Sequence, residues 1–306
     1  MTATASHEPR SEGPKLFATG LGFPEGPVVM PDGSFVCVDS YRGQLTIIGA
    51  DSAPRRLAST GGAPNSCVLG ENGIFYVCQN GGTTGPWRAD RMIEPSIQVV
   101  APGGEAAALL TEVAGVKLNG PNDLCFAADG SLVFTDPGTY NPANPDPSFI
   151  HRILPNGSAQ VLIAFPEPVF PNGVAVESDG SILWDESYTG HVGRLRPDGS
   201  IEDLGRPADG PSVPDGLKVG ADGRIYVTDF LGGGIHVLAP DGKRVDFLPC
   251  GAAVTNCAFD EATLWITDVG LTALGTEASS EGRIWRMAVP GGGLPTYRGH
   301  IARRPG

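Results

Sequence analysis

Six side chains that carry oxygen donors recur at one position of a repeated sequence motif. They are Glu25, Asn65, Asn122, Asn172, Asp215 and Asn256. Carboxylate and amide oxygens, without histidine or cysteine, are the donors that calcium takes in proteins, whereas zinc favours nitrogen and sulfur. The set therefore predicts a site for one divalent cation, with calcium as the first candidate and zinc, manganese or magnesium as alternatives.

The repeated motif consists of a turn, a short apolar run, a second turn and a run of β-branched and aromatic residues. Its first five copies begin with FPEGP at Phe23, APNSC at Ala63, GPNDL at Gly120, FPNGV at Phe170 and VPDGL at Val213. In each of them the donor residue stands seven residues before the second turn. A sixth copy, which begins at Val254, is shorter by two residues. One spacing kept over five copies indicates a structural repeat.

Each copy continues into further β-rich runs that end in turns, which predicts four strands per repeat. Six such repeats predict an all-β fold, a six-bladed β-propeller with four-stranded blades. We expect residues 15–300 to form this single domain and residues 1–14 to be a disordered tail. The segment KLFATGL at 15–21 is expected to supply the outer strand of the last blade and so close the ring.

In a propeller the first strand of each blade lines the central channel, so six equivalent positions should converge on the axis. Asn and Asp are also ordinary turn formers, and any one of the six donors could be only that. Their common register favours a shared site. By contrast, the Asp residues of the second turns are expected to be hairpin residues: Asp32, Asp129, Asp179 and Asp222.

The bulk composition bears on partners and compartment. A formal net charge of -13 argues against a nucleic-acid partner, because phosphates demand a basic surface. No run of about 18 apolar residues is present, so we expect no membrane partner either. The partner we expect is a small-molecule substrate. The cysteines lie in apolar patterns, which favours free thiols in a reducing cytoplasm, with a Cys250–Cys257 pair as the alternative. The oligomeric state stays open.

Four motifs in order resemble one known family. They are FPEGP at 23–27, LNGPNDL at 118–124, FPNGV at 170–174 and VPDGL at 213–217. The chain resembles the senescence marker protein/gluconolactonase/luciferin-regenerating-enzyme family, which includes regucalcin. The resemblance implies a six-bladed propeller whose metal ligands are Glu25, Asn122, Asn172 and Asp215. It also implies that Asp215 is the catalytic residue, as general base or nucleophile, and that Asn119 contacts substrate.

The function that the resemblance implies is that of a metal-dependent hydrolase, a lactonase that opens a cyclic ester at the calcium-type site. Asn65 and Asn256 fill the two remaining axial positions, and Tyr140 and Trp87 lie in long loops, so these four are further candidates for substrate binding. Two alternatives remain open. The same metal site could hydrolyse organophosphates or serve isomerisation and ring opening in small-molecule metabolism, or the chain could be a non-enzymatic binding propeller.

Overall fold

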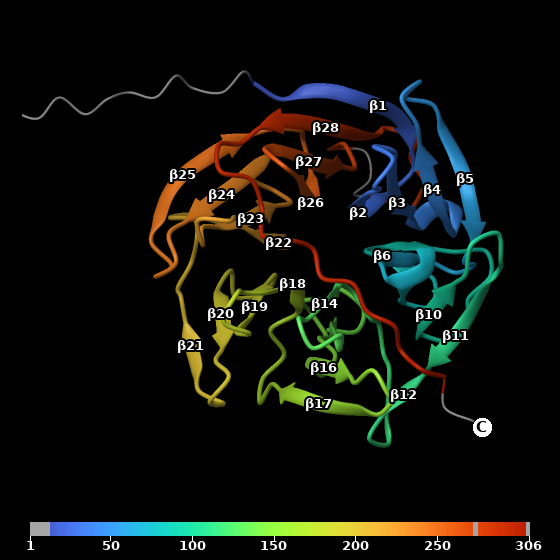
Figure 1. Ribbon diagram of the computed structural model, residues 1–306, viewed down its shortest axis with the longest axis horizontal. Helices are drawn as coiled ribbons and strands as arrows, with labels where there is room; N and C mark the ends of the chain where they lie inside the picture. The colour runs from blue at the N-terminus through green and yellow to red at the C-terminus, as the bar shows by residue number, and fades with distance from the viewer. Residues whose placement is uncertain (1–12, 272–274, 304–306) are drawn as a thin grey trace, which may run out of the picture.

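Each copy of the repeat folds into one four-stranded antiparallel sheet, and the six sheets stand around a central axis as the blades of a propeller (Figure 1). The structure is a computed structural model and describes residues 13–271 and 275–303. The predicted six-bladed, all-β architecture is therefore confirmed. Of the tail predicted as disordered, residues 1–12 lie outside the described residues.

The strands of each blade follow one another from the axis outward. The inner strands are β2 (Pro24–Val29), β6 (Pro64–Leu69), β14 (Leu124–Phe126), β18 (Pro171–Val176), β22 (Pro214–Val219) and β26 (Val254–Asp260). The second strands are β3 (Phe35–Asp39), β7 (Phe75–Gln79), β15 (Leu132–Asp136), β19 (Ile182–Glu186), β23 (Ile225–Asp229) and β27 (Thr263–Asp268).

The third strands are β4 (Gln44–Ile48), β10 (Ser96–Val100), β16 (Phe149–Ile153), β20 (Val192–Leu195), β24 (Gly234–Leu238) and β28 (Gly282–Ala288). The outer strands are β5 (Pro54–Ser59), β11 (Ala106–Leu110), β17 (Ala159–Ala164), β21 (Ile201–Asp203), β25 (Arg244–Pro249) and β1 (Lys15–Leu21). We number the blades 1 to 6 from β2 to β26.

The ring closes as predicted, because β1 pairs with β28 and completes blade 6. Closure removes the free edges that an open sheet would expose. Thr255 Oγ1 of blade 6 also donates a hydrogen bond of 2.9 Å to the carbonyl of Pro24 in blade 1. The junction between the two ends of the ring is therefore joined in the innermost strands as well as in the outermost ones.

Apolar side chains of neighbouring blades pack face to face between the sheets. One such cluster contains Val36 and Val38 of blade 1 together with Cys67 and Val77 of blade 2. Because a blade is apolar on both faces, it is stable only between two others, which explains why the repeat closes into a ring. All six cysteines are free, including Cys250 and Cys257.

An acidic or amide residue at the end of most second strands holds the turn that leads into the inner strand. Asp39 accepts hydrogen bonds from the backbone of Gly22, at 2.9 Å, and Phe23, at 3.2 Å. Asp136 does the same for Gly120, at 2.7 Å. These side chains fix the backbone at the point where most inner strands enter the channel.

The remaining elements are short. Two hairpins fall in the long interval between the second and third copies, β8 (Thr83–Thr84) with β9 (Trp87–Arg88) and β12 (Glu112–Val113) with β13 (Val116–Lys117). Single 3₁₀ turns occur at Ser40–Arg42 and Glu71–Gly73. Over the described ranges, none of the helices has the length and apolar character needed to cross a membrane.

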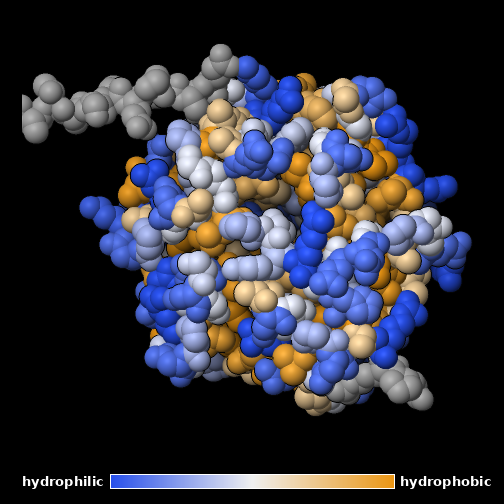
Figure 2. Space-filling view, in the orientation of Figure 1, coloured by the Kyte–Doolittle hydropathy of each residue, from blue (hydrophilic) through white to orange (hydrophobic). Residues whose placement is uncertain are grey.

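The segment after β28 crosses one face of the propeller, and we call residues 289–303 the C-terminal strap (Figure 1). Its backbone bonds to Val219 in blade 5 and to Glu71 in blade 2. Near its end, Ile301 N donates a hydrogen bond of 2.8 Å to the Tyr76 hydroxyl. Figure 2 shows this face, where hydrophilic side chains surround the centre. The strap therefore lies over one mouth of the channel.

Candidate metal centre at the propeller axis

The register of the inner strands places two rings of residues around the channel. The first ring contains Glu25, Asn65, Asn122, Asn172, Asp215 and Thr255. The second ring follows one residue later in each strand and contains Gly26, Ser66, Asp123, Gly173, Gly216 and Asn256. Strand pairing breaks register at this point in β2, β6, β18, β22 and β26. Such bulges turn successive side chains toward the same side, here toward the axis.

Blade 6 differs from the predicted alignment. Val254 pairs with Asp268 at the end of β27, just as Pro214 pairs with Asp229 at the end of β23. Counted from this shared anchor, Asn256 lies one position deeper than predicted. The sixth copy lacks the Pro that precedes the donor residue in the other five, so the sequence alone aligned Asn256 with the first ring instead of the second.

Thr255 thus takes the first-ring position in blade 6. Its hydroxyl is engaged with Thr267 at 2.7 Å and with Pro24 across the ring junction. Asn256 takes the second-ring position that Gly216 holds in blade 5. The predicted equivalence of Asn256 with Glu25 is therefore wrong by one residue.

Glycine after the first-ring residue is required by close packing of the inner strands. A Cβ on Gly173 would lie 2.5 Å from the Leu217 backbone nitrogen, and one on Gly216 would lie 2.4 Å from the Asn256 side chain. Gly26 combines a similar approach to blade 2 with a φ of +55°. The Pro-X-Gly motifs therefore place a donor at X and let the next strand close against it.

Two carboxylates and two amides of the first ring gather at one end of the channel. Glu25 and Asn172 are buried, and Asn172 Nδ2 donates to Ser187 Oγ at 3.0 Å while its side chain also bonds to Asp215. Asn122 is buried, and its Oδ1 has no hydrogen-bond partner among the described residues. A buried amide oxygen without a partner is costly unless a ligand or ion completes it.

Several carboxylates lie close together at this end of the channel, and this affects their pKa values. Burial raises the pKa of Glu25 well above its usual range, and the charges of Asp215 and Asp123 add to the effect. Burial likewise raises the pKa of Asp215, with Asp185 and Asp123 as further causes. A nearby cation would reverse both shifts, because opposite charge favours the ionised carboxylate.

A cavity of about 330 Å³ opens above the first ring. Its described lining comes from the loops between strands and consists of Phe23, Glu25, Asn65, Asn80, Thr83, Thr84, Gly85, Pro86, Gly120, Asn122, Gly138, Thr139, Tyr140, Phe170, Asn172, Ser187, Val213, Asp215, Phe230 and Leu231. The volume lies in the range of small-molecule sites. The cavity therefore gives a small ligand access to the two carboxylates.

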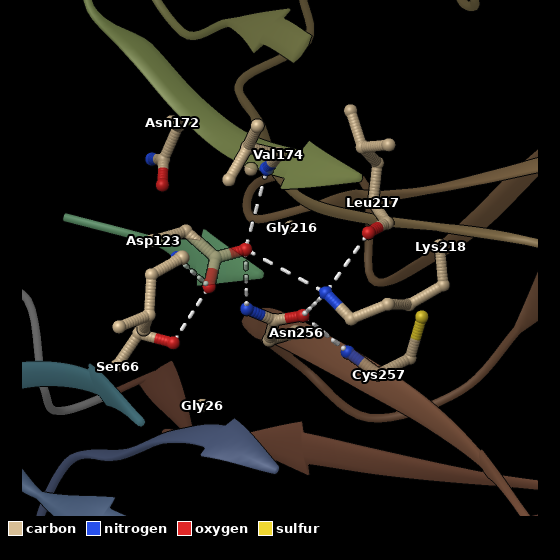
Figure 3. A network of polar contacts seen from close by, with 12 residues as sticks. Gly26, Ser66, Asp123, Asn172, Val174, Gly216, Leu217, Lys218, Asn256 and Cys257 are labelled. Atoms are coloured by element: carbon tan, nitrogen blue, oxygen red, sulfur yellow. Dashed lines mark hydrogen bonds and ion pairs between the residues drawn. The ribbon is translucent and has the colours of Figure 1, made fainter. Parts of the chain in front are cut away.

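The second ring holds a different arrangement, in which a lysine enters the channel (Figure 3). Lys218 Nζ lies 3.6 Å from Asp123 Oδ2 and donates to Asn256 Oδ1 at 3.2 Å. Burial opposes the ammonium charge, but Asp123, together with smaller effects of Cys257, Cys125 and Glu25, outweighs it and the pKa of Lys218 is raised. Ser66 completes the network by donating to Asp123 Oδ1 at 2.6 Å.

Asn256 joins the two rings. Its Oδ1 accepts from Lys218, which leaves Nδ2 to donate to Glu25 Oε2 at 3.0 Å and to Asp123 Oδ2 at 3.4 Å. The amide therefore orients the Glu25 carboxylate from below. The structure places Asn256 beside the predicted metal centre rather than in the lining of the upper cavity.

Of the other predicted substrate contacts, Asn65 and Tyr140 line the cavity, and Asn119 and Trp87 do not. Asn119 is exposed, with its amide nitrogen against Gly138 of the cavity wall. Trp87 is buried against Tyr41, with ring centroids 4.8 Å apart, and so supports the hairpin that carries the wall.

Sequence reasoning missed Asp123 and Lys218. A signal for Lys218 was present in the repeat, three residues after the first-ring position. The residues there are Val28, Val68, Cys125, Ala175, Lys218 and Ala258, and only the fifth is charged. A lone lysine in an otherwise apolar ring predicts a buried partner of opposite charge.

The first-ring donors fit a hard divalent cation. The metal ligands would all be oxygens, from Glu25, Asn122, Asn172 and Asp215. Among them, Asn122 Oδ1 has no hydrogen-bond partner and is free to coordinate a cation. Within residues 13–271 and 275–303, no group of three or more His, Cys, Asp or Glu side chains is arranged to hold a metal. Any cation here would therefore depend on the amides as well as the two carboxylates.

The fold and the axial donors define the class, a six-bladed propeller with an acidic channel mouth. Residues 23–270 match the model of the SMP-30/gluconolactonase/LRE-like region, and the chain belongs to this family. No curated protein matches the sequence.

Solved structures with the same fold have low sequence identity to the chain. A gluconolactonase from Xanthomonas campestris is 23% identical, with a TM-score of 0.71 over 90% of this chain and 89% of that one. A luciferin-regenerating enzyme is 16% identical, with a TM-score of 0.75 over 94% and 100%. Regucalcin from Agrobacterium tumefaciens, a calcium-binding protein, is 15% identical, with a TM-score of 0.73 over 96% and 98%.

Proposed function

We propose that this protein is a lactonase, which opens a cyclic ester at a divalent cation held by Glu25, Asn122, Asn172 and Asp215. The observation that carries the proposal is the presence of two carboxylates, the buried Glu25 and the half-buried Asp215, beside the unsatisfied Asn122 Oδ1 at the floor of an accessible cavity. A scaffold that only binds another protein has no need of this arrangement. Family membership and the gluconolactonase relative support the same reaction class.

Calcium is the cation we propose, because the four donors are all oxygens and calcium accepts irregular oxygen shells. The regucalcin relative is itself a calcium-binding protein, which supports this choice. A bound cation supplies polarisation of the lactone carbonyl and stabilises the negative charge that develops on its oxygen.

Asp215 is the residue we assign to proton transfer. In hydrolysis, water adds to the lactone carbonyl carbon while Asp215 accepts a proton from it, and the bond from that carbon to the ring oxygen breaks. The ring oxygen takes up a proton, and the product is the hydroxy acid. The hydrogen bond from Asn172 orients the Asp215 carboxylate for this task. Direct attack by Asp215 on the carbonyl is the alternative route.

The test combines metal analysis with activity. The purified protein is expected to contain a divalent cation, to release acid from at least one lactone, and to stop when a chelator removes the cation. Asp215→Asn and Glu25→Gln should each lower kcat/KM by roughly 10²-fold or more. Asp32→Asn is the matched control, because Asp32 is an exposed turn residue bonded to Ser34.

Near-wild-type hydrolysis by Asp215→Asn would remove the role assigned to that residue. Hydrolysis that continues unchanged in a metal-free preparation would overturn the proposed centre. An organophosphate and an isomerisation substrate in the same screen compare the reaction types that the scaffold also permits.

A further inference from the structure

Much of the wall of the cavity above the first ring is apolar. The rings of Phe23 and Phe230 stack with their centroids 6.5 Å apart, and Tyr140 meets Phe170 edge to face at 5.1 Å. Leu231 stands beside them with 59% of its surface exposed. These side chains come from blades 1, 3, 4 and 5, so the apolar wall faces the carboxylates from several directions.

Phe170 is held in a strained conformation. Its φ is +55°, which bulky residues rarely adopt. Strain of this kind persists where the surrounding structure requires it, and it is frequent beside binding sites. Here it keeps an aromatic ring in the wall directly before Pro171 and Asn172 of the inner strand.

Two polar residues of the cavity lining, Asn80 and Ser187, are already satisfied by contacts within the protein. Asn80 donates to Thr83 O at 2.6 Å and accepts from the backbone of Gly82 and Thr83. Ser187 donates to Pro214 O at 2.7 Å and accepts from Asn172. These groups therefore build the wall and leave little hydrogen-bonding capacity for a ligand.

Phe23, Phe170, Phe230 and Leu231 offer no hydrogen-bond partner to a substrate with many hydroxyl groups. The described lining also contains no Lys, Arg or His. The hydroxyl groups of a polyhydroxylated substrate would lose their water against this part of the wall without regaining equivalent contacts.

We propose that the substrate is an uncharged lactone that carries an alkyl or aryl substituent, with the substituent against Phe23, Phe170, Phe230 and Leu231. This inference rests on the proposed lactonase function and adds the class of lactone. Each methylene transferred from water to an apolar wall improves binding by about fourfold. A side chain of several carbons therefore separates this class clearly from sugar lactones.

Three lactones with the same six-membered ring test the proposal on the calcium-loaded protein. They are δ-valerolactone without a substituent, δ-decalactone with a pentyl chain, and glucono-δ-lactone with hydroxyl groups. We expect kcat/KM for δ-decalactone to exceed that for δ-valerolactone by roughly 30-fold or more. Equal values, or a preference for glucono-δ-lactone, would overturn the proposal while leaving the lactonase function in place.

Substitutions in the apolar wall test whether the pentyl chain of δ-decalactone binds there. Phe230→Ala and Leu231→Ser should each reduce the advantage of the pentyl chain by roughly fivefold or more, with a smaller effect on δ-valerolactone. Leu57→Ser is the matched control, because Leu57 is a partly exposed leucine of the outer strand β5. An advantage that is unchanged in both wall variants would contradict the assignment of the pentyl chain to this wall.

The proposed function can fail independently of the substrate class. If neither these three nor any other lactone of the screen is hydrolysed, the lactonase proposal is wrong, and calorimetry with δ-valerolactam and its pentyl-substituted analogue then tests the wall alone. Tighter binding of the pentyl-substituted lactam by roughly 30-fold supports an apolar cyclic ligand. Equal binding, or no binding of either lactam, overturns it.

Discussion

The first and second rings of the channel are adjacent layers of the same inner strands. They differ in whether their carboxylates have a cationic side chain beside them. In the second ring, Asp123 has the ammonium group of Lys218 at 3.6 Å. In the first ring, Glu25 and Asp215 have pKa values that are raised by burial and by the charges of neighbouring carboxylates. One layer contains its own cation, and the other presents anions to an accessible cavity.

The difference separates a structural ion pair from a candidate binding site. A buried charge is tolerated when it is paired and hydrogen-bonded, as Asp123 is by Lys218, Ser66 and the backbone of Val174. Carboxylates without such a partner favour the binding of a cation from solution. Asn256 links the layers, so the fixed cation below helps to orient the carboxylate of Glu25 above.

The largest expected effect comes from removing the cation of the second ring. Lys218→Met leaves Asp123 as a buried charge without its partner, and the free energy of unfolding should fall by about 3–5 kcal/mol. Denaturant unfolding measures this loss, with the exposed Lys243→Met as the control. The double variant Lys218→Met, Asp123→Asn should lose less than the sum of the single losses. Wild-type stability of Lys218→Met would show that the pair is not structural.

The next effect concerns the first ring and depends on pH. Raised pKa values of Glu25 and Asp215 mean that the metal-free folded state holds their protons more tightly than the unfolded state does. Stability with chelator should therefore fall as pH rises above about 4, where the unfolded carboxyls ionise, and continue to fall until the folded groups ionise too.

Calcium should counter that loss. Calcium at a hundred times its Kd adds about 2.7 kcal/mol to the free energy of unfolding. The fall in Tm with rising pH should then shrink or disappear. Thermal melts from pH 5 to 8, with chelator and with calcium, measure both effects. The double variant Glu25→Gln, Asp215→Asn should show neither the pH slope nor the response to calcium. A chelated wild-type protein whose Tm does not change over this range would contradict the account.

The smallest effect compares the two mouths of the channel. Tyr76→Phe removes the hydrogen bond from Ile301 N that fixes the end of the C-terminal strap, and the cost should be about 1 kcal/mol of unfolding free energy. Because the strap covers the mouth away from the candidate site, lactone hydrolysis should not change. Steady-state kinetics at a temperature well below unfolding tests this. A drop in kcat/KM would show that the two mouths are coupled.

The fold could be predicted because its information is repeated. Turn spacing and alternating apolar residues recur in every copy, so errors in one copy are corrected by the others, and the apolar pattern of residues 15–21 indicated the closing strand. The first-ring positions Glu25, Asn65, Asn122, Asn172 and Asp215 followed from the same register.

The errors arose where the repeat is irregular or tertiary contacts decide. Blade 6 lacks the Pro that precedes the first-ring residue in the other five blades, so the position of Asn256 depended on the pairing of Val254 with Asp268, which only the structure shows. Trp87 was predicted to face the substrate, but its packing on Tyr41 depends on how a long loop folds back on blade 1. Such contacts carry no periodic signal in the sequence.

The closure of the ring by β1 and β28 has a consequence for how the protein is made. Leu16 pairs with Trp285, so the closing sheet joins early and late parts of the chain and forms only after the other blades have been synthesised. Pairing over such a sequence separation is slow. Glu25 and Asp215 are held at one axis only in the closed ring. Cation binding is thus expected to appear in the last step of folding, and its rate would measure how quickly the ring closes.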